Sequence, residues 1–428
     1  MNSFLRQAIA CMVKHEHKWN DALTVIEVTD KGMRRATNQD SSVVVLQGEE
    51  DAYQQRGHLF VVCDGMGAHA AGELASGDAV DHIPHHYLVY QSLSPPEALK
   101  KAIIKANEEI HRKGQENLDF HNMGTTCSSI LLIPQGIICG HVGDSRVYRQ
   151  RGNVIEQLTF DHSLQWELKA KGGDIENVPS NVITRSLGPN AEVEVDLEGP
   201  FPVKAGDCYL ICSDGLSGEV TDSEIGAAMA TLPPEQAAQF LLDLANLRGG
   251  PDNITIIIVQ FKGPDFVTDV EGVEQIVIGK QTTPKKPLNP ILLVASISLS
   301  LAGLLLLSIN PIVGIAMAAT GIVTGLVGFM LGRTGVESGE TLERDYRFGS
   351  GPYTKNNCVP DATILQGLGQ TANEIRQLAQ EHPDKFNWAP FDEAFVESTE
   401  QMQGGQFVEA FRNIARAITF IMNEFRRG

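Results

Sequence analysis

Four aspartates, each next to a glycine or another small residue, stand at the ends of short apolar runs in the first 261 residues. They are Asp64, Asp144, Asp214 and Asp252. One Asp-Gly pair beside a strand is usually only a turn. Four such carboxylates in one domain predict more than turns. If the strand ends converge, the carboxylates repel one another unless cations lie between them.

The region from about residue 21 to residue 261 alternates short apolar runs with helical stretches, which predicts a mixed α and β domain. The runs rich in Val, Ile and Leu are predicted strands. They are Ser42–Leu46, Leu59–Cys63, Cys127–Ile133, Gly136–Val142, Cys208–Cys212 and Ile254–Phe261. The predicted helices are Gly72–Tyr90, Pro96–Glu116 and Pro234–Asn246.

Charge and cysteine content exclude some classes of function. The formal net charge of -19 argues against nucleic acid as a partner, because phosphates repel such a surface. The 7 cysteines are scattered without the paired spacing of a metal site, which suits buried thiols in a reducing compartment. The apolar run at the N-terminus is too short for a signal peptide.

Residues 287–332 contain no charged side chain and consist of two apolar halves separated by Asn310-Pro311. Each half is near the roughly 20 residues that a helix needs to cross a bilayer, so we expect a transmembrane helical hairpin. Lysines precede it and arginines follow it, which predicts that both flanks face the cytoplasm from the inner membrane. The alternative is a buried helical hairpin in a soluble domain.

The four aspartates also indicate which metal the predicted site would bind. Hard oxygen ligands with few Cys or His favour Mg²⁺ or Mn²⁺ over zinc. The segment Arg34-Arg35-Ala36-Thr37-Asn38-Gln39-Asp40 adds arginine, whose planar fork suits phosphate oxygens. Two metals about 4 Å apart can activate a water for attack on a phosphate. No P-loop or kinase glycine loop is present in the sequence, so hydrolysis fits better than transfer from a nucleotide.

Eight ordered motifs carry a family resemblance. They are RRATNQDS, VVCDGMGAHAAGELAS, MGTTCSSILL, GHVGDSRVYR, LTFDHS, ITRSLG, LICSDGLSGEV and GGPDNITIIIV, between Val25 and Phe261. Together they resemble the type 2C metal-dependent Ser/Thr protein phosphatases, also called the PPM family, of the bacterial branch. The resemblance implies an α+β fold, a four-layer α-β-β-α sandwich with the metals in a cleft at one edge. It does not extend beyond Phe261.

The resemblance implies a metal-binding role for each matching residue. Asp64 would bridge two catalytic Mg²⁺ or Mn²⁺ ions, and the Gly65 carbonyl would bind one of them. Asp214 and Asp252 would complete the ligand set of the other ion. Asp144, with Asp214, would hold the third ion seen in bacterial members.

Further residues would support the two-metal centre by the same resemblance. Asp40 would contact a metal through a water molecule. Arg35, rather than Arg34, would bind the substrate phosphate, because it lies four residues before Gln39. Asn253 would order the loop around Asp252.

The sequence departs from the family pattern at several positions. Gln39 stands where many members have Glu, which removes a negative charge near the metals. Ala68 replaces a glycine, and Met66 stands where animal members have a proposed acid histidine. His69 is a candidate general acid, although a lone His beside a helix start is more often structural. His162 is more typical of a residue that holds a loop, so the identity of the acid stays open.

These observations predict four segments. Residues 1–265 form the catalytic domain, residues 266–288 a linker, residues 289–332 the transmembrane hairpin, and residues 333–428 a loop and a small all-α domain of unknown role. The predicted function is a membrane-tethered phosphatase that hydrolyses phosphoserine and phosphothreonine in cytoplasmic proteins by two-metal activation of water. Its substrates would be the products of Ser/Thr kinases.

The sequence leaves two other functions open. One is a weak or inactive pseudophosphatase that serves as a membrane-anchored binding module. The retained aspartates and Arg35 speak against it, and only Gln39 favours it. The other is hydrolysis of a phosphate ester that is not a protein. The C-terminal segment has an apolar helical face from Phe407 to Phe425, which is predicted to pack on the helix near Thr363–Gln380 or to dock a partner.

Overall fold

The structure is a computed structural model in which the chain divides into two compact units. The larger unit holds residues 1–90, 98–275 and 344–428, and the smaller one residues 91–97 and 276–343. The described residues are 11–67, 70–175, 178–179, 182–268, 277–278, 290–333, 340–341, 348–379 and 387–427.

The larger unit contains two antiparallel sheets. The first has 7 strands in the order β1-β2-β12-β11-β8-β9-β15. Their bounds are β1 Cys11–Lys14, β2 Leu23–Asp30, β12 Ile254–Phe261, β11 Cys208–Cys212, β8 Arg146–Arg151, β9 Val154–Gln157 and β15 Thr354–Asn357. The second sheet has the order β10-β7-β6-β4-β3, with β5 paired to β4. These strands are β10 Asp196–Phe201, β7 Gly136–Val142, β6 Cys127–Ile133, β4 His58–Met66, β3 Asp40–Val45 and β5 Gly124–Thr125.

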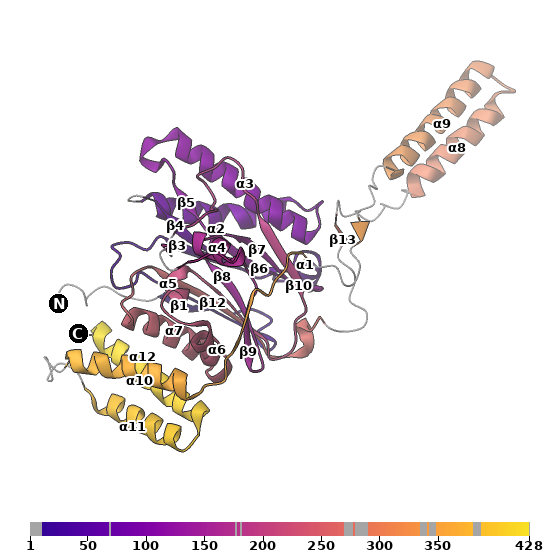
Figure 1. Cartoon of the computed structure of the whole chain (residues 1–428). Coiled ribbons are helices and arrows are strands. Elements are labelled where there is room, and N and C mark those ends of the chain that lie inside the picture. The colour runs from indigo at the N-terminus through magenta and orange to yellow at the C-terminus, as the bar shows by residue number, and fades with distance from the viewer. Residues whose placement is uncertain are drawn as a thin grey trace. The chain divides into compact units, whose positions relative to one another are not determined.

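Helices cover the outer face of each sheet (Figure 1). Helix α2, Ala71–Val89, packs on β3 and β4, and helix α7, Pro234–Leu247, packs on β2 and β12. Helix α3, Pro95–Glu116, reaches the second sheet at Gly140, where an added Cβ would meet the Ile103 side chain at 2.9 Å. Helix α6, Asp222–Thr231, contacts β8 and β9. The predicted four-layer α-β-β-α sandwich is confirmed.

The alternation of side chains along β11 explains why its sequence is apolar throughout. Tyr209 and Ile211 belong to the core between the two sheets. Cys208, Leu210 and Cys212 belong to the core between the first sheet and its helices. Successive strand residues point to opposite faces, so a strand that is covered on both faces needs apolar residues at every position. The cysteines therefore serve as small core residues.

The C-terminal helices belong to the larger unit. They are α10 Ala362–Ala379, α11 Ala389–Gln403 and α12 Phe407–Arg427. Helix α12 packs on α10, as expected, and also on α7, where the rings of Phe411 and Phe240 lie 5.5 Å apart. Before these helices, β15 pairs with β9 and extends the first sheet. The four predicted segment boundaries stay a prediction.

Shorter elements complete the chain. The helices α1 Glu50–Arg56, α4 Leu164–Ala170 and α5 Asp214–Ser217 belong to the larger unit, as do the 3₁₀ turns Leu118–Phe120 and Pro264–Phe266. The smaller unit pairs β13, Val277–Ile278, with β14, Glu340–Thr341. It also holds α8, Pro290–Leu306, and α9, Pro311–Arg333.

Helices α8 and α9 form a hairpin, but the transmembrane prediction needs correction. Their backbones approach closely, because a Cβ at Gly303 would meet the Ala318 nitrogen at 2.4 Å. Helix α8 has 17 residues, which span about 26 Å, less than the roughly 30 Å of a bilayer's hydrocarbon core. Among the described residues, no helix combines the length and the apolar character that a membrane span requires. The predicted transmembrane hairpin is therefore not supported.

Candidate active site

The pairing of β3 with β4 brings the first two carboxylates together. The strands are antiparallel, and Asp40 at the start of β3 lies directly opposite Asp64 near the end of β4. Ser213 Oγ donates to Asp40 Oδ2 at 2.7 Å, and the Thr126 hydroxyl accepts from the Asp64 backbone N–H at 2.9 Å. Both aspartates are thereby held at one end of the second sheet.

The first sheet contributes two more carboxylates at the same end. Strands β11 and β12 are antiparallel, with Cys212 opposite Ile256. Asp214 comes just after β11, and Asp252 lies just before β12, so both leave the sheet at one edge. Gly215 lets the backbone pass there, because an added Cβ would meet the Asn253 carbonyl oxygen at 2.0 Å.

Asp144 lies in the connection from β7 to β8, which crosses from one sheet to the other. Gly143, directly before it, has φ 114 and faces Thr126 so closely that a Cβ would clash with its side chain at 2.6 Å. Only glycine adopts this backbone conformation without strain. The structure thus brings together all five predicted aspartates, Asp40, Asp64, Asp144, Asp214 and Asp252.

Burial and mutual repulsion perturb this cluster. Burial, followed by the charges of Asp40, Asp214, Asp144 and Asp252, raises the pKa of Asp64 well above its ordinary value. Burial raises the pKa of Asp40 to about 7, and burial with the Asp214 charge raises the pKa of Asp144 to about 7. Such a cluster is stable in its ionised form only with compensating positive charge.

Unpartnered oxygens show where that charge would lie. Asp40 Oδ1, Asp144 Oδ1 and Asp214 Oδ1 are buried and have no hydrogen-bond partner among the described residues. A buried acceptor without a partner is costly, and a cation would satisfy it. The donor set, carboxylate oxygen throughout, is the one that Mg²⁺ and Mn²⁺ prefer. The residues therefore fit divalent cations.

The aspartate oxygens are spread more widely than one ion would require. Among the described residues, three ligand atoms lie within 4.8 Å of one another in a different group of side chains. That group is His82, His86 and Glu109. The aspartate oxygens therefore surround a wider space, and they come from the ends of five strands.

Gly65 follows Asp64 where three segments meet. Its backbone N–H donates to the Gln39 carbonyl at 3.0 Å, and an added Cβ would meet the Gly72 carbonyl at 2.2 Å. The position therefore accepts only glycine. The Gln39 side chain reaches Gly72 at the start of α2, and the Ser76 hydroxyl donates to the Gln39 carbonyl at 2.6 Å.

Arg35 lies at the rim of the cluster. Its Nη2 donates to Asp252 Oδ2 at 2.6 Å, and its side chain is 48% exposed. The Arg34 guanidinium lies near Gly249, three residues before Asp252. Of the two arginines, Arg35 is therefore the one whose cationic fork faces both the carboxylates and solvent.

Asn253 ties the loop of Arg35 to the loop of Asp252. Its side-chain nitrogen donates to the Lys31 and Thr37 carbonyls, both at 2.9 Å. Its side-chain oxygen accepts from the Gln39 backbone N–H at 2.8 Å. One amide thus fixes both ends of the segment that carries Arg35.

The sequence indicated two histidines, His69 as a candidate general acid and His162 as a residue that holds a loop. His69 lies outside the described residues, together with Ala68. His162 is buried, and its Nδ1 accepts from the Gly143 N–H at 3.0 Å while Nε2 contacts Asp196 Oδ2 at 2.9 Å. These bonds hold the loop that carries Asp144.

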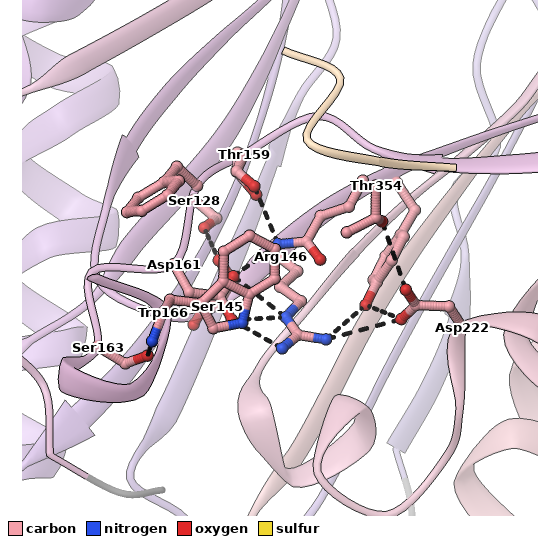
Figure 2. A network of polar contacts seen from close by, with 12 residues as sticks. Ser128, Ser145, Arg146, Thr159, Asp161, Ser163, Trp166, Asp222 and Thr354 are labelled. Atoms are coloured by element: carbon pink, nitrogen blue, oxygen red, sulfur yellow. Dashed lines mark hydrogen bonds and ion pairs between the residues drawn. The ribbon is translucent and has the colours of Figure 1, made fainter. Parts of the chain in front are cut away.

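A polar network that was not predicted from the sequence lies behind Asp144. Figure 2 shows Arg146 between Asp161 and Asp222. Its guanidinium lies 2.7 Å from Asp161 Oδ2 and 3.6 Å from Asp222 Oδ1. Asp222 also accepts from the Thr354 hydroxyl of β15 at 3.4 Å. The network therefore links the C-terminal strand to the residue two positions after Asp144. The signal was Arg146 itself, in a motif interpreted only for its aspartate.

Ser213 and Thr126 were also missed as supporting residues. The Ser213 hydroxyl donates to Asp40 and accepts from the Thr255 N–H at 3.0 Å, so it joins β3, β11 and β12. Its place directly before Asp214 was a usable signal. Thr126 lies directly before β6, and its hydroxyl oxygen lies 2.7 Å from Ser145 Oγ. That partner could not be found without the fold.

Comparison with known proteins agrees with this geometry. The family model described as Protein phosphatase 2C matches residues 26–169. The Serine/threonine phosphatase stp of Listeria monocytogenes is 33% identical over 242 residues, which cover 54% of this chain and 93% of that protein. Protein phosphatase PhpP of Streptococcus pneumoniae is 33% identical over 249 residues, covering 56% of this chain and 97% of that protein.

A solved structure is also similar. The Mycobacterium tuberculosis serine/threonine phosphatase PstP/Ppp shares 32% sequence identity, covers 56% of this chain and 100% of its own, and has a TM-score of 0.49. The two curated relatives are matched over nearly their whole length, and the matched part of this chain is the one that carries the aspartate cluster. The chain therefore belongs to the protein phosphatase 2C family of metal-dependent Ser/Thr phosphoprotein phosphatases.

Proposed function

We propose that this phosphatase hydrolyses phosphoserine and phosphothreonine at the aspartate cluster, with Mg²⁺ or Mn²⁺ bound there. The observation that carries the proposal is the convergence of five carboxylates, three of which have a buried oxygen without a partner among the described residues, beside an exposed arginine. Asp64, Asp214, Asp252 and Asp144 would hold the ions, and the Gly65 carbonyl would add a ligand. Asp40 would act through water. Two ions are expected at the catalytic position, and a third beside Asp144.

Bound divalent ions would supply a polarised water and positive charge for the phosphate oxygens. The chain's own residues provide the rest. Arg35 would exchange its contact with Asp252 for the substrate phosphate, which its planar fork can grip in bidentate fashion. Asn253 keeps the Arg35 loop against the Asp252 loop, so the phosphate meets the carboxylates in one orientation.

Protein substrates are favoured over small esters by the family and by the position of Arg35. The Listeria relative is named a serine/threonine phosphatase and the Streptococcus relative a protein phosphatase, and the 48% exposed Arg35 side chain suits a phosphate carried on a large surface. The products of Ser/Thr kinases are the corresponding substrate class. A pseudophosphatase that only binds would tolerate loss of an aspartate. All five are retained, and only Gln39 favours that alternative.

Substrate profiling of the full chain tests this proposal. Phosphate release is measured with Mn²⁺ from a phosphothreonine peptide, a phosphotyrosine peptide and a sugar phosphate, each repeated after chelation. The proposal expects metal-dependent release with preference for the phosphothreonine peptide. Faster hydrolysis of the sugar phosphate would reject the substrate class. No hydrolysis of any substrate, with intact metal binding, would support the pseudophosphatase.

A further inference from the structure

A second group of metal-ligand side chains lies on the helical layer, apart from the aspartate cluster. His82 and His86 belong to α2, and Glu109 belongs to α3. His82 Nδ1 lies 3.0 Å from Glu109 Oε2, and His86 Nε2 lies 3.1 Å from Glu109 Oε1. All three ligand atoms lie within 4.8 Å of one another. The proposed hydrolysis uses none of these residues.

Helix geometry produces this convergence. Residues four apart lie one above the other on the same face of a helix, so both imidazoles point toward α3. The side chains of His82, His86 and Glu109 are 36%, 14% and 25% exposed. They are held partly out of water while one side stays open to solvent. His85, between them in sequence, is exposed and outside the group.

We propose that His82, His86 and Glu109 bind a Zn²⁺ ion. Two imidazole nitrogens and a carboxylate are a common zinc donor set, and they suit Mg²⁺ poorly. A tetrahedral ion with bonds of about 2.1 Å holds its ligand atoms about 3.4 Å apart. The two imidazole nitrogens lie 3.0 and 3.1 Å from different oxygens of Glu109, and one ligand atom from each residue lies within 4.8 Å of the others, so small side-chain rotations bring the three atoms to this spacing. The solvent side leaves the fourth position for water.

The protonation states of the two histidines are consistent with zinc binding. Without an ion, the proton on His86 Nε2 lies in a hydrogen bond to Glu109 Oε1, and His82 Nδ1 lies 3.0 Å from Glu109 Oε2. Neutral imidazole can place its proton on either nitrogen. When zinc binds, the proton lies on Nε2 of His82 and on Nδ1 of His86, and the freed lone pairs bind the metal. Glu109 contributes a carboxylate oxygen, so the ligands together carry one negative charge.

A simple seam of ion pairs between α2 and α3 is the competing interpretation. One turn further along, Lys113 Nζ pairs with Asp78 Oδ2 at 2.8 Å, and this contact needs no metal. The histidine group differs because one carboxylate is shared by two imidazoles from the same helix face. An ion there would clamp α2 to α3. Helix α2 begins beside Gly65 and Gln39, so the clamp would also steady the helix that abuts the aspartate cluster.

Zinc binding to the purified full chain decides between the zinc site and the ion-pair seam. After chelation, zinc titration calorimetry is performed in excess Mg²⁺, which occupies oxygen-rich sites. The variants are His82→Ala, His86→Gln and Glu109→Gln. The matched controls are His85→Ala and His121→Ala, at two exposed histidines outside the group. We expect the controls to keep the wild-type stoichiometry. The three ligand variants should lose one equivalent or bind it more than about tenfold more weakly, since even outer partners of metal ligands contribute about 10- to 100-fold.

A second measurement needs no variant. Co²⁺ in a four-coordinate site with nitrogen and oxygen ligands absorbs visible light far more strongly than Co²⁺ in a six-coordinate oxygen site. When Co²⁺ is added to the wild-type chain in excess Mg²⁺, the strong absorption should appear. One equivalent of Zn²⁺ should then displace the Co²⁺ and abolish the absorption. Equal zinc binding by the wild type and all variants, or the absence of the strong absorption, would reject the site whether or not the chain has phosphatase activity.

Discussion

Asp40 and Asp64 lie directly opposite each other on paired antiparallel strands. Strand pairing normally disfavours like charges in this position. Here the pair is buried, and burial raises the pKa of both carboxyl groups. Such an arrangement costs stability unless cations offset it, which is why the register itself points to a metal centre. The Ser213 hydroxyl, at 2.7 Å from Asp40, holds one member of the pair in place.

Arg35 is expected to bind the substrate phosphate. Replacing it with Ala should lower kcat/KM for a phosphopeptide by about 10- to 100-fold, mainly through KM, because a charge-assisted contact contributes about 1.5–3 kcal/mol. Arg35→Lys should recover only part of this loss, since Lys lacks the planar fork. Steady-state kinetics with Mn²⁺ provide the measurement.

Arg34→Ala is the matched control for Arg35. Arg34 is adjacent in sequence, but its guanidinium lies near Gly249. Its removal should change kcat/KM by less than about twofold, well under the effect of a lost charge-assisted bond. If both variants behave alike, the assignment of Arg35 to the phosphate is wrong and general surface charge is responsible.

The C-terminal helices are expected to stabilise the catalytic unit. Phe411 of α12 is fully buried, and its ring lies 5.5 Å from that of Phe240 on α7. Phe411→Ala should lower the free energy of unfolding by about 3–5 kcal/mol through lost burial and a cavity. Val408→Ala, on the same helix but 38% exposed, should cost less than about 1 kcal/mol. Urea unfolding of the full chain measures both. Equal effects would show that α12 does not pack on α7.

Glu224 should make stability depend on pH. Burial tends to raise the pKa of its carboxyl group, but hydrogen bonds and the charge of Arg248 outweigh burial and lower that pKa below 4.5. A carboxyl group with a lowered folded pKa contributes stability above its unfolded pKa, and this stability is lost as pH falls through the folded value. Glu224→Gln should therefore cost about 2 kcal/mol at pH 7, and less as pH falls below 4.5.

The exposed pair Arg112–Glu116 provides the comparison for Glu224. Its side chains are 64% and 60% exposed, so Glu116→Gln should cost less than about 0.5 kcal/mol at either pH. Urea unfolding at several pH values from 7 down to about 3 measures both variants, because the contribution of Glu224 is lost only below its unfolded pKa of 4.5. A cost for Glu224→Gln that is the same at every pH would contradict the electrostatic account.

The sequence predicted the parts of the fold that depend on local patterns. The strand Cys208–Cys212 was found with its observed bounds because it is apolar on both faces. Asp64 was found because it directly follows the apolar run Leu59–Cys63 and because three further aspartates stand at the ends of such runs, although β4 itself continues to Met66. Strand β15, with the sequence TKNN, was missed, since its polar side chains carry no strand pattern and its pairing with β9 is set by tertiary contacts.

Long-range partners were beyond sequence reasoning for the same reason. Nothing near Asp222 in the sequence indicates that Thr354 will contact it, and nothing near Phe240 indicates Phe411. The apolar stretch 287–332 was interpreted by length and lack of charge alone. Of its two helices, α8 has 17 residues, so composition predicted a helical hairpin correctly but not a membrane span.

The most direct test of the central claim is Mn²⁺-dependent phosphate release from a phosphothreonine peptide by the full chain and its Asp214→Asn variant. Asp214 has a buried oxygen without a partner among the described residues. Asp265→Asn is the control, because Asp265 is exposed. We expect the control to match the wild type and Asp214→Asn to lose at least about 99% of the activity, a barrier increase of about 2.7 kcal/mol or more. An Asp214→Asn variant that remains as active as the wild type would contradict the assignment of the aspartate cluster as the catalytic metal centre.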